Sequence, residues 1–143
     1  MRYMLIMRST PEAEVASKDI PFEDILNSMG RYNDELIKSG VLLAAEGLAP
    51  PEDGGFVVDF NADPPVVTDG PYTEAKELFN GFWMLEVSGR EEAAEWAKKC
   101  PLGPGVKLEV RRVPTIDEFP QDNEYIQRER EWRAEHDGAS RTA

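Results

Sequence analysis

Apolar side chains recur along this chain with two different spacings. Four segments have the length and the dense aliphatic and aromatic content of strands: residues 2–8, 41–48, 81–87 and 106–113. Residues 21–39 and 88–101 instead place apolar side chains three and four positions apart, which is the period of an amphipathic helix. The pattern predicts two strand–helix–strand units, one after the other.

Residues with capping or turn chemistry mark the ends of these elements. Gly40 directly follows the first helical segment, where a glycine commonly ends a helix. Ser88 and Glu91 have the spacing of a capping box at the start of the second helical segment. Residues 9–19 are polar and contain a proline, so we expect them to form a loop.

A hairpin and a C-terminal extension complete the chain. Residues 56–60 and 65–68 are short strand-like runs separated by turn-forming residues, which predicts a hairpin between the two units. Residues 122–135 are highly charged and are expected to form a helix. We therefore expect a domain of residues 1–113 and a charged extension of residues 114–143.

The order of the elements favours an α+β fold, a ferredoxin-like βαββαβ sandwich with the hairpin as an addition. In such a fold the helices cover one face of an antiparallel sheet and leave the other face open. Phe82, Met84, and Tyr3 or Met4 would make that face too apolar to stay in water. We therefore expect a homodimer that buries it.

Composition and charge narrow the choice of partners. The 143 residues suit a single domain, and 16 basic against 28 acidic residues give a net charge of −12. That charge argues against binding to nucleic acid or to an anionic membrane. A single cysteine excludes an internal disulfide and a multi-cysteine zinc site.

The apolar run near the N-terminus is too short for a signal peptide or a membrane span, so a cytoplasmic location is expected.

The most specific stretch is Asp69-Gly70-Pro71-Tyr72-Thr73-Glu74-Ala75-Lys76-Glu77, followed shortly by Gly81-Phe82-Trp83. Together with residues 1–7 and the run from Gly40 to Pro50, this string resembles the DGPF-domain branch of the YCII-related (YciI-like) family. The resemblance extends over roughly residues 1–113. Tyr72 stands where the name of the branch expects phenylalanine.

The resemblance implies a ferredoxin-like fold in dimers of the dimeric α/β-barrel type. It also implies a His–Asp pair in a cleft, of which only the aspartate is matched here, by Asp69. The one histidine, His136, lies in the charged extension. Some relatives are encoded near, or fused to, alternative sigma factors, so the resemblance includes a regulatory role. Related dimeric barrels include lactone isomerases and dehalogenases.

Asp69 is the candidate catalytic residue, and two interpretations of it stay open. Its carboxylate could accept hydrogen bonds from nearby backbone N–H groups in a turn, or it could act as a general base in a cleft. Gly70 would permit a close ligand approach, and Pro71 would stiffen the loop. Further candidates for ligand binding are Gly70, Pro71, Tyr72, Glu74, Lys76, Glu46, Tyr32 and Asn33.

Each of the other candidates also has a structural alternative. Lys76 could hold an anionic substrate near Asp69, or it could lie with Glu74 on a solvated helical surface. Glu46 interrupts an apolar strand, and if buried it must either form an ion pair or line a pocket. Tyr32 and Asn33 would line a pocket that opens against the first long helix, or would be polar groups at the edge of the core.

No motif for a nucleotide, a metal or a serine nucleophile occurs, so no cofactor and no metal site are expected. Two functions remain. The first is a dimeric protein that binds a small ligand or a protein partner, which the unmatched histidine favours. The second is a small isomerase- or lyase-like enzyme that uses Asp69 as general acid or base, assisted by Glu46 or Lys76.

Overall fold

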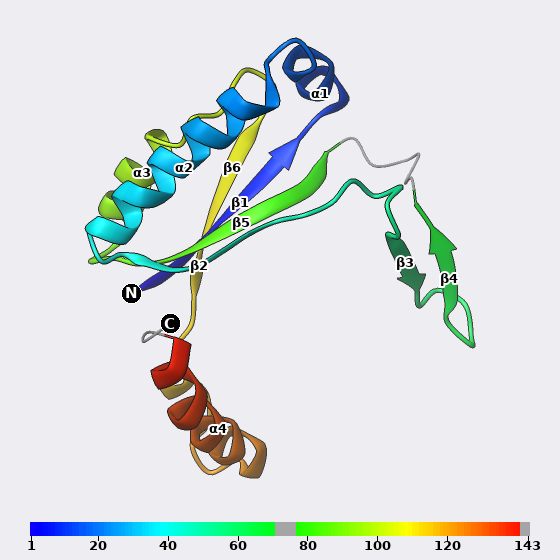
Figure 1. Cartoon of the computed structure of the whole chain (residues 1–143). Coiled ribbons are helices and arrows are strands. Elements are labelled where there is room, and N and C mark those ends of the chain that lie inside the picture. The colour runs from blue at the N-terminus through cyan, green and yellow to red at the C-terminus, as the bar shows by residue number, and fades with distance from the viewer. Residues whose placement is uncertain (71–76, 141–143) are drawn as a thin grey trace.

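The structure is a computed structural model that describes residues 1–70 and 77–140, with the side chains of residues 137–140 left out (Figure 1). The order of the elements is β1 (Arg2–Ser9), α1 (Pro11–Ser17), α2 (Phe22–Lys38), β2 (Leu42–Gly47), β3 (Phe56–Asp59), β4 (Val66–Asp69), β5 (Leu78–Glu86), α3 (Arg90–Lys98), β6 (Lys107–Val113), η1 (Ile116–Glu118) and α4 (Glu124–Ser140). The expected α+β class is confirmed.

Four strands form the main sheet, in the order β2-β5-β1-β6. Every neighbouring pair in it is antiparallel, and the two central strands, β1 and β5, pair over their full length. With the hairpin left aside, this order is compatible with a ferredoxin-like arrangement. None of the helices within the described residues is long and apolar enough to cross a membrane.

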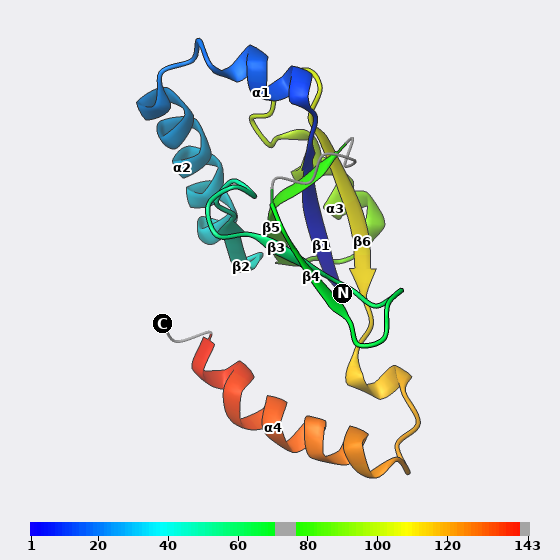
Figure 2. The ribbon, with the colours of Figure 1, turned by 90° about the vertical axis from the view of Figure 1, so that its right-hand side faces the viewer.

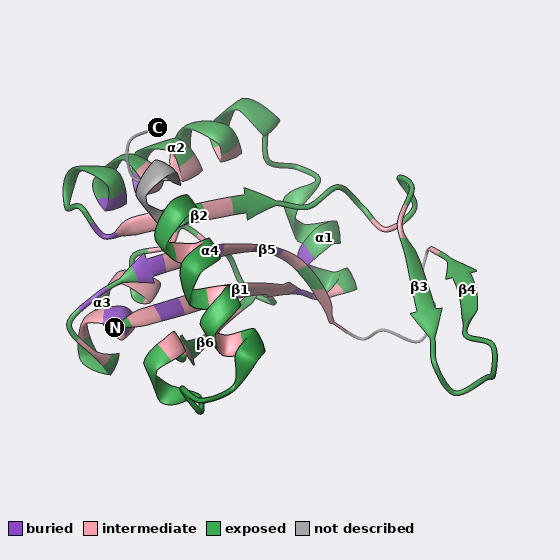
Figure 3. Cartoon of the chain, turned by 90° about the horizontal axis from the view of Figure 1, so that it is seen from below, coloured by how far each residue is buried: buried purple, intermediate pink, exposed green. Residues whose placement is uncertain are grey.

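Helices α2 and α3 cover one face of this sheet (Figure 1). Figure 3 colours buried positions along β1 and β5. The buried core residues come from both central strands, both helices and positions directly beside them. They are Tyr3, Leu5, Tyr32, Leu36, Val41, Trp83, Leu85, Val87 and Ala93. Tyr3 therefore belongs to the core, and of the two alternatives named for the opposite face, Met4 is the one that lies there.

The opposite face of the sheet, here called the open face, has an apolar centre. Met4 lies across from Met84, and Ile6 lies across from Phe82 in the β1–β5 ladder. All four side chains are half-buried, since neither α2 nor α3 lies on this side. Charged residues of the edge strand β6 flank this centre.

The predicted end of the first long helix is confirmed at Gly40. Its φ of 73° is one that side-chain-bearing residues rarely adopt. The Gly40 N–H donates to the Ile37 carbonyl at 3.0 Å, and the Val41 N–H donates to the Leu36 carbonyl at 3.1 Å. These two bonds form a Schellman motif, which turns the chain directly into β2.

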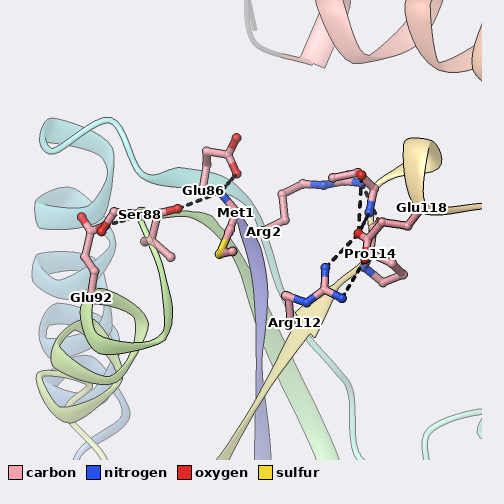
Figure 4. Close-up of polar contacts among 10 residues, drawn as sticks. Met1, Arg2, Glu86, Ser88, Glu92, Arg112, Pro114 and Glu118 are labelled. Carbon is pink, nitrogen blue, oxygen red and sulfur yellow. Dashed lines mark hydrogen bonds and ion pairs between the residues drawn. The ribbon is translucent and has the colours of Figure 1, made fainter.

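Two local predictions were wrong. Residues 11–17 form helix α1 and not a loop, because Thr10 caps its N-terminus by accepting from the Ala13 N–H and Pro11 occupies the first turn. Helix α3 begins one residue later than expected, with Gly89 as its N-cap. Glu92, not Glu91, accepts a hydrogen bond from the Ser88 N–H, at 2.5 Å (Figure 4).

The predicted hairpin is present and forms a separate two-stranded sheet of β3 and β4. We call residues 56–69 the arm. It projects from the end of the main sheet, away from α2 and α3 (Figure 1, Figure 2). Both of its strands are exposed along their whole length.

The charged extension leaves the sheet at the end of β6, and side chains hold its start in place (Figure 4). Both Arg112 terminal nitrogens donate to the Glu118 carboxylate at 2.8 Å, and the Thr115 N–H donates to the same carboxylate at 2.6 Å. The Arg112 partnership, followed by the Thr115 bond, lowers the pKa of Glu118 to about 2. Glu118 therefore stays ionised and keeps this connection above that pH.

Candidate functional site: a groove beside helix α2

A groove of about 980 Å³ lies between helices α1 and α2 on one side and strands β2 and β5 on the other. Its apolar walls come from α2 and from the ends of the strands, and they include Phe22, Ile25, Leu26, Met29, Leu48 and Leu78. A hollow of this volume is large enough for a small organic molecule.

The walls of the groove are apolar but uncovered. Phe22 is 72% exposed, Leu26 is 54% exposed and Leu48 is 51% exposed. Large apolar side chains that gather in one concave place are typical of a binding site, whereas isolated ones are ordinary surface. The first turns of α2 thus present Phe22, Ile25 and Leu26 to the groove, and Met29 borders both the groove and the core.

A hydrogen-bonded pair of side chains lies at the groove between α2 and β5. The Trp83 Nε1–H donates to the Asn33 Oδ1 at 2.8 Å. An indole N–H is only a donor, so this bond fixes which end of the Asn33 amide faces Trp83. The Asn33 Nδ2 has no partner among the described residues, and Asn33 and Trp83 both line the groove.

Tyr32 holds Trp83 from the core side. The two rings meet edge to face with centroids 5.6 Å apart, and the Tyr32 hydroxyl donates to the Trp96 carbonyl at 2.9 Å. Burial raises the pKa of Tyr32 well above its ordinary value, so the hydroxyl remains a donor. Trp83 is therefore held between a rigid core contact and the amide of Asn33.

Charged groups at the groove are mostly acidic. Among the described residues, Glu14, Glu46 and Glu52 line it together with one cation, Lys18. This arrangement disfavours anionic ligands, as does the net charge of −12. No group of three or more histidine, cysteine, aspartate or glutamate side chains suited to a metal ion occurs within the described residues.

The structure brings two of the predicted site residues to the groove, Asn33 and Glu46. Glu46 is exposed on the edge strand β2, so it is not the buried carboxylate that would need an ion-pair partner. Tyr32 is buried and lies behind Trp83, outside the groove lining. It positions Trp83.

The motif around Asp69 lies elsewhere. Asp69 is the last residue of β4, is exposed, and faces Phe56 across the base of the arm. Gly70 is required there by the chain itself: a Cβ at this position would lie 2.5 Å from the Pro51 carbonyl oxygen. Pro71, Tyr72, Glu74 and Lys76 lie outside the described residues, and their expected roles stay predictions.

Cys100 lies away from the groove, packed against the core. Burial raises the pKa of its thiol to about 12. The thiol is therefore protonated at neutral pH and unreactive.

Fold and groove together define an α+β protein with a small-molecule-sized hollow and one uncovered sheet face. A comparison with family models then matches residues 1–116 to the YCII-related domain, so this chain belongs to the YCII-related family. No curated protein matches the sequence. The match includes the whole main sheet and the groove, while α4 lies beyond it.

Sequence reasoning did not identify Phe22, Leu26 and Leu48 as site residues. The first two belong to the apolar stripe of α2, which the sequence shows only as the period of an amphipathic helix. Trp83 is a core residue at 7% exposure, and its indole N–H also bonds to Asn33 at the groove.

Proposed function

We propose that this protein is a homodimer that binds a small, uncharged and largely apolar molecule in the groove beside α2. The observation that supports this most directly is the combination of exposed apolar walls with one oriented amide, that of Asn33. The proposal keeps the interpretation of a ligand-binding YCII-related protein and takes the enzyme as the alternative.

The chemical class of the ligand follows from the lining. The apolar walls favour a ring or an aliphatic body, and the acidic side chains disfavour an anion. Because the Asn33 Oδ1 already accepts from Trp83, the group of this amide without a partner among the described residues is its NH2, which can donate to a ligand. A ketone, an ester, a lactone or an amide carbonyl on an apolar body matches this set.

Dimerisation is supported by the amount of surface that one chain exposes. A folded monomer of 16.1 kDa has an accessible surface of about 7,400 Å² by size scaling, whereas this chain exposes 10563 Å². The excess, about 3,000 Å² per chain or about 6,000 Å² for two chains on the same scaling, reaches the upper end of what obligate dimers bury, about 2,000–5,000 Å² or more in total. The open face, with Met4, Ile6, Phe82 and Met84 at its centre, is the surface that we propose to be buried.

The groove is tested with prodan, an uncharged naphthalene that carries a ketone and whose fluorescence reports its surroundings. Leu26→Arg places a charged side chain in the apolar wall and should weaken prodan binding at least tenfold. Ile37→Arg is the matched control, because Ile37 is a similarly exposed residue of α2, at 59% against 54%, outside the groove lining.

Binding that survives Leu26→Arg, or that falls equally in both variants, would contradict the groove as the site. Asn33→Asp sharpens the test, since a carboxylate still accepts from Trp83 but has no N–H for a ketone. We expect this variant to remain folded and to bind prodan less tightly. If Asn33→Asp bound prodan with unchanged affinity, the Asn33 amide would not contact the ligand, but the groove could still be the binding site.

Several finer predictions rest on the sequence or on the family resemblance. Membership of the DGPF branch, assembly as a dimeric α/β barrel and a regulatory role beside an alternative sigma factor come from the resemblance. A cytoplasmic location and the division into residues 1–113 and 114–143 come from the sequence pattern. The alternative enzymatic function requires the carboxylate of Asp69. Loss of turnover on a lactone in Asp69→Asn, with prodan binding retained, would support it.

A further inference from the structure

Within residues 1–70 and 77–140, no part of the chain covers the arm. Its exposed apolar side chains are Phe56, Val57, Val58, Phe60, Val66 and Val67, with exposures from 39% to 79%. An isolated two-stranded hairpin is marginally stable in water, and an apolar one also invites association. The arm therefore needs a second surface.

One of its two faces is the more apolar. Val58 and Val67 lie directly opposite each other, and Phe56 precedes them on the same face, where its cross-strand neighbour at the base of the arm is Asp69. The other face carries Val57 and Val66, each beside a polar cross-strand neighbour, Thr68 and Asp59 respectively. We call the side of Phe56, Val58 and Val67 the apolar face of the arm.

Charge distinguishes the arm from the sheet. The arm holds Asp59, Asp63 and Asp69 and no lysine or arginine, so its net charge is −3. On the open face, strands β1 and β6 hold four basic residues and one acidic residue, a net charge of +3 within a chain of net charge −12. The basic residues are Arg2, Arg8, Lys107 and Arg111, and the acidic one is Glu109; Arg112 lies opposite Tyr3 on the covered face.

Part of this positive charge is available to a partner. Arg111 is opposite Met4 in the ladder, on the open face, and its side chain is 72% exposed with only a long 3.8 Å contact to Glu109. Arg8 is instead already paired with Glu77 and Glu109. The open face thus combines the apolar centre defined above with an exposed arginine beside it.

From these observations we infer that the arm of one subunit docks, by its apolar face, on the open face of a second copy of this chain, over its β1–β6 half. The inference rests on the proposed dimer and adds that the docked arm stabilises it; we call this contact the clasp. Because the interface is two-fold symmetric, each subunit would give one arm and receive one. The partner is a second copy because a single chain carries both the acidic apolar arm and the basic apolar face.

The experiment measures the dimer dissociation constant by sedimentation equilibrium. Val67→Asp places a charge on the docking face and should raise that constant at least tenfold. Val66→Asp, at 49% against 60% exposure, places the same charge on the other face and should change it much less. Arg111→Glu should also raise it, and a mixture of Val67→Asp with wild type should give an intermediate value.

A second variant, which lacks the arm, covers the case in which a substitution simply unfolds the hairpin. Replacing residues 56–69 with a glycine–serine loop leaves the four-stranded sheet complete, and its circular dichroism should show a folded protein with a raised dissociation constant. Equal effects of Val67→Asp and Val66→Asp would contradict docking of the arm. So would an unchanged dissociation constant in the variant without the arm. Neither result would contradict the dimer. A wild-type mass of 16.1 kDa at all concentrations would overturn both the clasp and the dimer.

Discussion

The two halves of helix α2 have similar sequence patterns and different surroundings. In the C-terminal half Tyr32 and Leu36 are buried at 4% and 0% exposure, and a Schellman motif ends the helix. In the N-terminal half Phe22 and Leu26 are exposed, and the N-cap Pro21 provides no side-chain hydrogen bond. An apolar stripe therefore predicts a surface that needs a partner, and the partner is the core at one end and the groove at the other.

The largest expected contrast lies between Leu36 and Leu26. Leu36→Ala removes a fully buried side chain and should lower the free energy of unfolding by about 2–5 kcal/mol. Leu26→Ala removes an exposed one and should change it by about 0.5 kcal/mol or less. Urea denaturation followed by circular dichroism measures both, and comparable losses would mean that the two halves of α2 are packed alike.

Asn33 lies where the two halves meet, and its removal should have an intermediate effect. Asn33→Leu deprives the Trp83 indole N–H of its acceptor, which should cost about 1–3 kcal/mol of stability. Asn33→Asp keeps an acceptor and should retain more of that stability. If Asn33→Leu were as stable as wild type, the 2.8 Å bond would not hold Trp83 in place.

Two glycines of this segment should respond in opposite directions. Gly40→Ala forces a side chain into a φ of 73° and should destabilise the protein by about 1–2 kcal/mol. Gly30→Ala, in the interior of α2 where an added Cβ meets nothing within 4 Å, should stabilise it by about 0.5–1 kcal/mol. Shifts of the same sign in thermal melts would argue against the Schellman end.

The smallest expected effect is a difference in thiol reactivity between the core and the groove wall. Cys100 packs near Tyr32 with a pKa of about 12, so about one thiol in 10⁴ is ionised at pH 8. Iodoacetamide should modify it slowly in the folded protein, faster as the pH is raised, and rapidly in urea. In Leu26→Cys the added thiol should react with iodoacetamide much faster than Cys100, as followed by mass spectrometry. Similar rates would show that position 26 is not accessible to solvent.

Much of the fold is local and could be predicted. The alternating and continuous apolar runs identified the strands, and Gly40 marked the end of α2. Helix α1 was missed because Thr10 and Pro11 were interpreted as loop residues, although threonine before proline is also how a helix begins. The cap of α3 was displaced by one residue, since Ser88 and Gly89 both suit a helix start.

The site was less accessible to sequence reasoning, for a physical reason. The groove is formed between α1 and α2 and the ends of β2 and β5, and no local pattern encodes how these elements are placed. Asn33 was a candidate for lining a pocket against the first long helix, but its bond to Trp83 joins residues 50 positions apart. The conspicuous Asp69–Gly70 motif instead marks the base of the arm, where Gly70 passes close to Pro51.

The central claim, that the groove beside α2 is a ligand site, is tested most directly by nuclear magnetic resonance. We would record the indole N–H signal of Trp83 and the side-chain amide signals of Asn33 while prodan is added. The account predicts that both shift together with the backbone signals of α2 residues 22–33, and that Leu26→Arg abolishes these changes. Shifts confined to the arm or to α4, with the Trp83 indole unmoved, would contradict it.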